Sequence, residues 1–196
     1  MMKNIAKISG TIERTGEKFF CKGEEFERVF VHSKRISGVV DRVSVVIPVV
    51  INTDSDKAEF EGELRMREII NEQGKRCVDV FIFATKVNKY SGEDVNKISI
   101  DGVIVINKGI RTTPKGKTIV DLVIVNNKID RHYYIPCICW ARKAIIANDM
   151  PVGTNVTVFG RFQSREYIKT HEDGTKEVKT AYELSCMHIV SYESEE

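Results

Sequence analysis

Short runs in which apolar and polar residues alternate cover most of the chain, and Gly and Pro are sparse inside them. These runs are rich in Val, Ile, Phe, Thr and Tyr, which favour strands over helices. In the first half the pattern predicts strands near residues 4–12, 27–36, 42–51, 58–68 and 76–87. The second half repeats this order, with predicted strands near residues 97–107, 118–127, 132–140, 154–169 and 177–192.

The two halves also share local sequence patterns, which indicates a tandem repeat. The segments "KISGTI" and "AEFEGELRMRE" correspond to "SIDGVI" and "VTVFGRFQSRE" later in the chain. Gly10 thereby corresponds to Gly102, and Gly62 to Gly160, at an offset of roughly 90 to 100 residues, the size of a small domain. The predicted organisation is a first domain at residues 1–87, a polar linker at 88–97, a second domain at 98–192 and a short acidic tail at 193–196.

One short helix is predicted, between the third and fourth strands of the second half. Residues 141–148 are good helix formers, and the following "MPVG" stops them, whereas "NTDSD" in the first half is too short and too polar for a helix. Five strands with a helix after the third is the order of the OB-fold, a Greek-key barrel that often binds oligonucleotides. The predicted fold class is therefore all-β with one short helix, in two tandem five-stranded OB-fold barrels; a β-sandwich is the alternative.

The composition indicates the cellular compartment in which such a protein is found. The chain is 42% hydrophobic and 30% charged, and it has no run of about 18 apolar residues and no secretory signal pattern, so we expect a cytoplasmic protein without a membrane partner. The five cysteines are an odd number without a C-x-x-C pair, which indicates reduced thiols. Because the net charge is only +2, any surface that binds a polyanion must be local.

The fourth strand of the second half carries the most informative surface, because its side chains alternate between two faces. One face is apolar and is expected to fill the barrel: Val156, Val158, Gly160 and Phe162. The other face combines rings and cations: Phe159, Arg161, Gln163, Arg165 and Tyr167. Single-stranded nucleic acid offers phosphates to arginine and base faces to aromatic rings, so this face is a predicted binding surface. In the alternative, Phe159 covers the helix and the arginines form cross-strand ion pairs.

The third strand adds to this surface. Tyr134 and Trp140 share one phase of the strand, and Trp140, the single Trp of the chain, is followed closely by Arg142 and Lys143. Rings beside cations suit base stacking and phosphate neutralisation. The predicted nucleic-acid-binding residues are Tyr134, Trp140, Arg142, Lys143, Phe159, Arg161, Arg165, Tyr167 and Lys169.

These motifs resemble the bacterial single-stranded DNA-binding proteins (SSB). The resemblance spans residues 98–190 and lies in Tyr134, in "WARKA" at 140–144 and in "GRFQSREY" at 160–167. It implies that Tyr134, Trp140 and Tyr167 stack on bases, that single-stranded DNA is the partner, and that two-domain chains form a homodimer with four OB domains. Replication or repair proteins are further implied partners. The chain departs from the family in lacking a clear aromatic on the second strand and a long tail with an acidic, Phe-tipped end.

The first half is expected to bind nucleic acid weakly, because the outward face of its fourth strand lacks aromatic rings. The corresponding outward positions are Glu61, Glu63, Arg65, Arg67 and Ile69, and the two acids repel phosphate. Phe19 and Phe20 are placed at the tip of the first loop, where they pack on the barrel or reach a base. The weaker candidates are Lys128, Tyr133, Lys34, Arg35, Arg65, Arg67, Phe19 and Phe20.

The sequence contains no recognisable catalytic motif. Its four histidines are scattered, and it has no nucleophile elbow, no phosphate loop and no metal-ligand spacing, so we expect neither an enzyme nor a cofactor. The leading hypothesis is non-catalytic binding and protection of single-stranded DNA in replication, recombination or repair. The alternative is a primosome-type OB-fold module that mainly binds protein. An RNA-binding OB protein also stays open, because stacking does not depend on the sugar.

Overall fold

The computed structural model describes residues 2–70, 74, 76–170 and 174–193, without the side chains of 169 and 170. The first half forms β1 (Asn4–Cys21), β2 (Glu24–Lys34), β3 (Val40–Pro48), the 3-10 turn η1 (Val49–Ile51), β4 (Lys57–Ile70) and β5 (Arg76–Lys89). The second half forms β6 (Asn96–Thr112), β7 (Thr118–Lys128), β8 (Arg131–Trp140), α1 (Arg142–Asn148), β9 (Asn155–Thr170) and β10 (Lys176–Ser191). Most of the segment 71–74, where the sequence predicts a hairpin turn, and most of the predicted tail at 193–196 lie outside these described residues.

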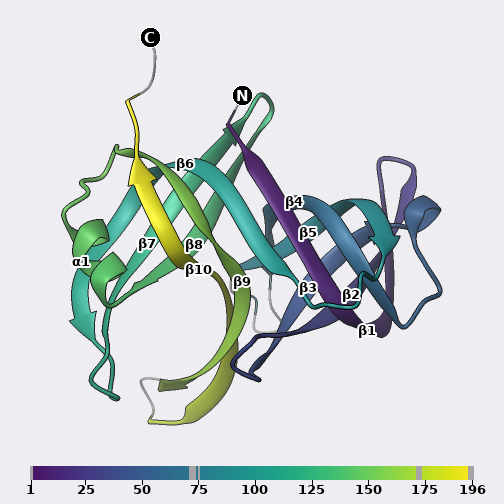
Figure 1. Cartoon of the computed structure of the whole chain (residues 1–196), viewed down its shortest axis with the longest axis horizontal. Coiled ribbons are helices and arrows are strands. Elements are labelled where there is room, and N and C mark those ends of the chain that lie inside the picture. The colour runs from purple at the N-terminus through teal and green to yellow at the C-terminus, as the bar shows by residue number, and fades with distance from the viewer. Residues whose placement is uncertain (1, 71–73, 75, 171–173, 194–196) are drawn as a thin grey trace.

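Each half closes into a five-stranded barrel with the same connectivity. In the first half β1 pairs with both β2 and β4, and β3 pairs in parallel with β5. In the second half β6 pairs with both β7 and β9, and β8 pairs in parallel with β10. This closed Greek-key order is the OB-fold, so the predicted pair of OB-fold barrels is confirmed and the sandwich is excluded. Figure 1 shows the two barrels side by side, with α1 on the outer side of the second.

Strands β1 and β6 join the barrels along an approximate two-fold axis. They pair antiparallel, which makes one ten-stranded sheet of the whole chain. Ala6 lies opposite Ile98, and these two positions correspond in the sequence repeat in the way that Gly10 corresponds to Gly102. Since equivalent residues face each other, the two halves meet as the subunits of a two-fold dimer do.

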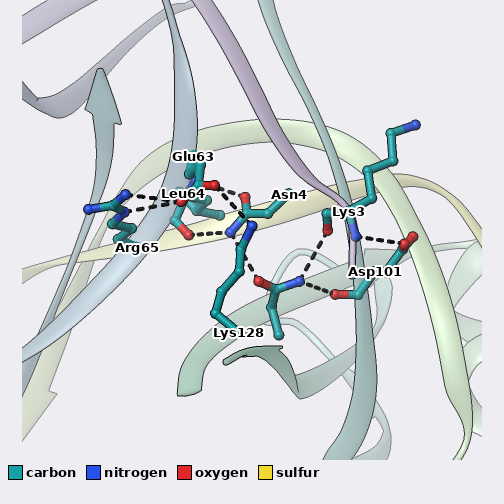
Figure 2. A network of polar contacts seen from close by, with 8 residues as sticks. Lys3, Asn4, Glu63, Leu64, Arg65, Asp101 and Lys128 are labelled. Carbon is teal, nitrogen blue, oxygen red and sulfur yellow. Dashed lines mark hydrogen bonds and ion pairs between the residues drawn. The ribbon is translucent and has the colours of Figure 1, made fainter. Parts of the chain in front are cut away.

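A polar network inside this junction repeats the same symmetry. The Asn4 side chain donates to the Leu64 carbonyl at 2.8 Å and accepts from the Leu64 N–H at 2.9 Å (Figure 2). Its counterpart, Asn96, makes the same two bonds with Phe162, at 2.7 and 2.9 Å. Each asparagine therefore ties the strand that starts its half to the fourth strand of that half, and buried backbone groups gain partners.

Charged groups connect the halves around Asn4 as well. Lys128 of β7 donates to Glu63 of β4 at 2.9 Å, and Glu63 also pairs with Arg65 (Figure 2). Asp101 of β6 accepts from the backbone N–H of Lys3 at 2.9 Å. The contacts therefore cross the junction from both sides and hold the barrels in a defined relative position.

The repeated glycines stand where the neighbouring strand comes too close for a side chain. A Cβ on Gly62 would lie 1.9 Å from the Phe83 carbonyl oxygen, and one on Gly160 would lie 2.2 Å from that of Ser185. The interior face predicted for β9 is confirmed, since Val156, Val158 and Phe162 are fully buried. All five cysteines are free, and none of the helices in the described part has the length and apolarity to cross a membrane.

Candidate nucleic-acid interface

A groove of about 800 Å³ opens on the outer face of the second barrel, lined by the end of β8, the turn before β7 and part of β9. Trp140 closes β8 opposite Ile119, the second residue of β7, and its ring is half-buried there. The turn before β7 carries Gly116 with a positive φ of 73°, which brings Lys117 back over the barrel. The Lys117 Nζ lies 6.0 Å from the centre of the Trp140 ring, so a ring and a cation share this wall.

The charged side chains that line the groove are all positive among the described residues. Its lining residues, as far as the structure describes them, are Arg35, Gly116, Lys117, Thr118, Trp140, Ala141, Arg161, Gln163, Ser164 and Arg165. Four of these side chains are cationic, and no Asp or Glu is among them. Such a concave surface with an aromatic wall suits a polyanion that also has flat faces to stack.

The two arginines of β9 have different partners. Arg165 pairs with Glu183 of β10 at 3.1 Å, and this hydrogen bond raises the pKa of its guanidinium. For Arg161, burial and then the neighbouring charge of Arg35 lower the pKa. The ion-pair alternative for this face is therefore correct for Arg165, while Arg161 forms no ion pair among the residues that the structure describes.

Gln163 corrects the simple alternation of β9. Its position points outward as predicted, yet only 5% of the residue is exposed. The side chain accepts a hydrogen bond from Arg35 of the first half at 3.2 Å and donates one to Glu183 at 3.0 Å. The first barrel therefore covers the middle of this face, and strand β3 packs near β9.

Phe159 lies apart from the groove. Its ring lies 6.1 Å from the ring of His188 on β10, and the Lys3 Nζ lies 5.5 Å from its centre. Phe159 therefore packs near Lys3 and β10. It neither joins Trp140 in the groove nor covers the helix, the two roles that the sequence suggested.

The two predicted tyrosines are accessible, but they do not line the groove. Tyr134 is 46% exposed and Tyr167 is 38% exposed, and the Arg165 guanidinium lies 5.8 Å from the Tyr167 ring. Arg142 and Lys143 are exposed at the start of α1. The Lys169 side chain falls outside the described part of the structure. Of the predicted set, Trp140, Arg161 and Arg165 are thus brought together in the groove.

Several weaker candidates are already engaged with other groups. Tyr133 is 6% exposed and packs in the core, so its ring is not presented to solvent. Lys128 pairs with Glu63. Lys34 is exposed, and Arg35 is brought by the fold into the groove of the second barrel. Sequence reasoning missed Lys117, although the turn-forming "TPKGK" before a strand is a signal for a cation held over the barrel.

A second aromatic cluster, which was not predicted from the sequence, lies on the outer face of the first barrel. Its rings come from β1, β2 and β5: Phe19, Phe26, Phe81 and Phe83. They line a groove of about 490 Å³, where the Arg65 guanidinium lies 3.8 Å from the centre of the Phe83 ring. Arg67 lies 5.3 Å from the Phe19 ring centre and pairs with Asp79.

The position of these rings corrects the expectation that the outer face of the first barrel lacks aromatic side chains. The outward face of its fourth strand lacks aromatics, as predicted, but the fifth strand supplies Phe81 and Phe83. Their alternation with the buried Val80 and Ile82 was the available signal. Phe19 packs on Phe26 at 5.6 Å between ring centres, whereas Phe20 stays exposed.

Comparisons with known proteins agree with this architecture. A model of the single-strand binding protein family matches residues 95–190. A comparison with curated protein sequences found no match. The wild-type single-stranded DNA binding protein from Thermus aquaticus has a similar structure, with a TM-score of 0.76, 16% sequence identity, and coverage of 100% of this chain and 95% of that chain. A deletion mutant of the same protein gives a TM-score of 0.75 and 15% identity, over 99% of this chain and 96% of that one. The chain therefore has the two-barrel fold of the Thermus aquaticus protein, and its second half matches the model of the single-strand binding protein family over residues 95–190.

Proposed function

We propose that the chain binds single-stranded DNA without catalysing a reaction on it, and that it protects exposed strands during replication, recombination or repair. The observation that carries this proposal is the groove on the second barrel, where Trp140 stands among four cations and no described acid lines the wall. Cations neutralise phosphates and release counterions, and a ring stacks on any base, so binding requires no particular sequence. The match of residues 95–190 to the model of the single-strand binding protein family supports the same conclusion.

A titration with labelled oligo-dT, oligo-U and duplex DNA at two salt concentrations tests the proposal. We expect oligo-dT to bind more tightly than duplex DNA, because paired bases are unavailable for stacking on Trp140. We also expect the affinity to fall as salt rises. Tighter binding of oligo-U would assign the groove to RNA. Absence of binding to all three probes would refute the proposal and favour a protein-interaction module.

We also propose that two chains associate into a homodimer with four barrels. The two-barrel architecture supports this, since the fold already joins two barrels along a two-fold axis. Light scattering at micromolar concentration should give twice the chain mass of 22.3 kDa. A monomer mass would contradict the dimer and leave DNA binding by the groove unaffected.

A further inference from the structure

Two arginines from different halves meet at the junction of two grooves. Arg35 follows β2 in the first half, and Arg161 lies on β9 in the second half. Both line the groove that contains Trp140, and both line a second groove of about 360 Å³ beside it. The second groove is formed by Ser33, Lys34, Arg35, Ile36, Ser37, Asp94, Asn96, Arg161 and Met187. Arg35 and Arg161 are the residues common to the two linings.

The charges at this junction are not balanced. Arg35 forms a two-bond ion pair with Asp41, which is buried. The Arg161 Nε is buried without a hydrogen-bond partner in the described part of the chain, and no ion pair to Arg161 occurs there. Asp94, the acid in the second groove, already accepts from the Lys34 backbone N–H at 2.7 Å. The Asp41 carboxylate thus pairs with Arg35 and leaves the neighbouring Arg161 unpaired among the described residues, and a buried donor without a partner costs free energy.

We infer that Arg35 and Arg161 together hold one backbone phosphate of a bound strand, where the strand crosses from the second barrel to the first. This inference rests on the proposed function and adds to it the course that a bound strand takes from one barrel to the other. A phosphate supplies the missing negative charge, and guanidinium groups bind phosphate with paired, directional hydrogen bonds. The first half then takes part in binding through the surface around Lys34, in contrast to the weak role that its fourth strand predicts.

The test uses full-length variants that do not leave a buried charge unpaired. Arg161→Gln removes a guanidinium that pairs with no carboxylate among the described residues. Arg35→Gln alone would strand the buried Asp41, which destabilises a fold strongly, so Arg35→Gln is combined with Asp41→Asn and compared with Asp41→Asn alone. Lys86→Gln is the matched control, because Lys86 is an exposed cation on β5 outside the lining of both grooves.

Oligo-dT affinity is measured across a salt series for each variant. Loss of one single-strand phosphate contact lowers the slope of log K against log salt by about 0.7. We expect this loss in Arg161→Gln, the same loss on removing Arg35 from the Asp41→Asn background, and no larger loss when both arginines are removed, because they share one phosphate. Lys86→Gln should keep the full slope. Additive losses from the two arginines, or no loss from either, would overturn the shared site.

A second measurement separates this site from the proposed function. Phosphate stabilises any folded protein more than chloride does, because it is excluded from the surface, so the rise in melting temperature from sodium chloride to sodium phosphate of equal ionic strength is compared between variants. This rise should be smaller in Arg161→Gln than in wild type and Lys86→Gln, because a bound phosphate adds to the stability of the latter two. If wild type fails to bind oligo-dT, the proposed function is refuted and this phosphate effect alone decides the anion site. A rise in Arg161→Gln as large as the rise in Lys86→Gln would then overturn it.

Discussion

Removing the indole of Trp140 should weaken DNA binding without changing its dependence on salt. The Trp140 ring forms the apolar wall of a groove whose charged lining side chains, among the described residues, are all cations. A base stacked on this ring contributes about 1 to 3 kcal/mol, which is about fivefold to about 150-fold in affinity. The slope of log K against log salt should stay constant in Trp140→Ala, because a neutral ring releases no counterions.

The assay is anisotropy of labelled oligo-dT, since Trp140→Ala removes the single Trp, whose fluorescence would otherwise report binding. Trp140→Phe is the matched control, because it keeps a ring in the groove and should recover most of the affinity. Trp140 also pairs across the sheet with the buried Ile119, so a melting curve must show that each variant is folded. In wild type, saturating oligo-dT should quench the single Trp.

Two results would refute this reasoning. One is a folded Trp140→Ala variant that binds oligo-dT as tightly as wild type. The other is a wild-type fluorescence signal that stays unchanged when the oligonucleotide is saturating. Either would show that the ring of Trp140 covers Ile119 and takes no part in binding.

Three further substitutions test the groove, the close strand contacts and the ion pairs. Lys117→Gln should lower the salt slope of oligo-dT binding by about 0.7, the value for one single-strand phosphate contact, and an unchanged slope would remove Lys117 from the interface. Gly160→Ala should destabilise the fold by about 1 to 3 kcal/mol in a denaturant titration, because its Cβ meets the Ser185 carbonyl oxygen at 2.2 Å; a wild-type midpoint would contradict the close contact. Burial alone raises the pKa of Asp79, but its bonds to Arg28 and Arg67 outweigh that effect and lower it below the ordinary 3.8. Its contribution to stability is therefore present above that pH and is lost as the pH falls through the folded-state pKa, so the difference in melting temperature between wild type and Asp79→Asn should shrink in acid and not at neutral pH.

The strand order and the sorting of side chains into two faces could be predicted because both depend on short-range patterns. A period of two places Val156, Val158 and Phe162 together wherever the strand lies in space. The predicted helix at 141–148 is observed as α1, since its propensity and its stop signal are local. The repeat of Gly62 and Gly160 marks the same close strand contact in both barrels.

The site was predictable only in part, because a groove is made by segments that are distant in sequence. Trp140 and Arg165 could be found from their strand phase. The ion pair of Arg165 with Glu183 and the burial of Gln163 could not, since both need the register of β9 on β10 and the cover from the first half. The distances between Tyr134, Trp140 and Tyr167 were equally inaccessible to pattern reasoning.

The sequence by itself determined the two barrels, the helix and the identity of the ring and cation face, because local periodicity and an internal repeat encode them. The tertiary structure decided which of these residues share one groove. It did so through the pairing of β1 with β6, which orients one barrel against the other and brings Arg35 beside Arg161. That pairing depends on the shapes of two folded surfaces, and no short-range pattern in the chain records it.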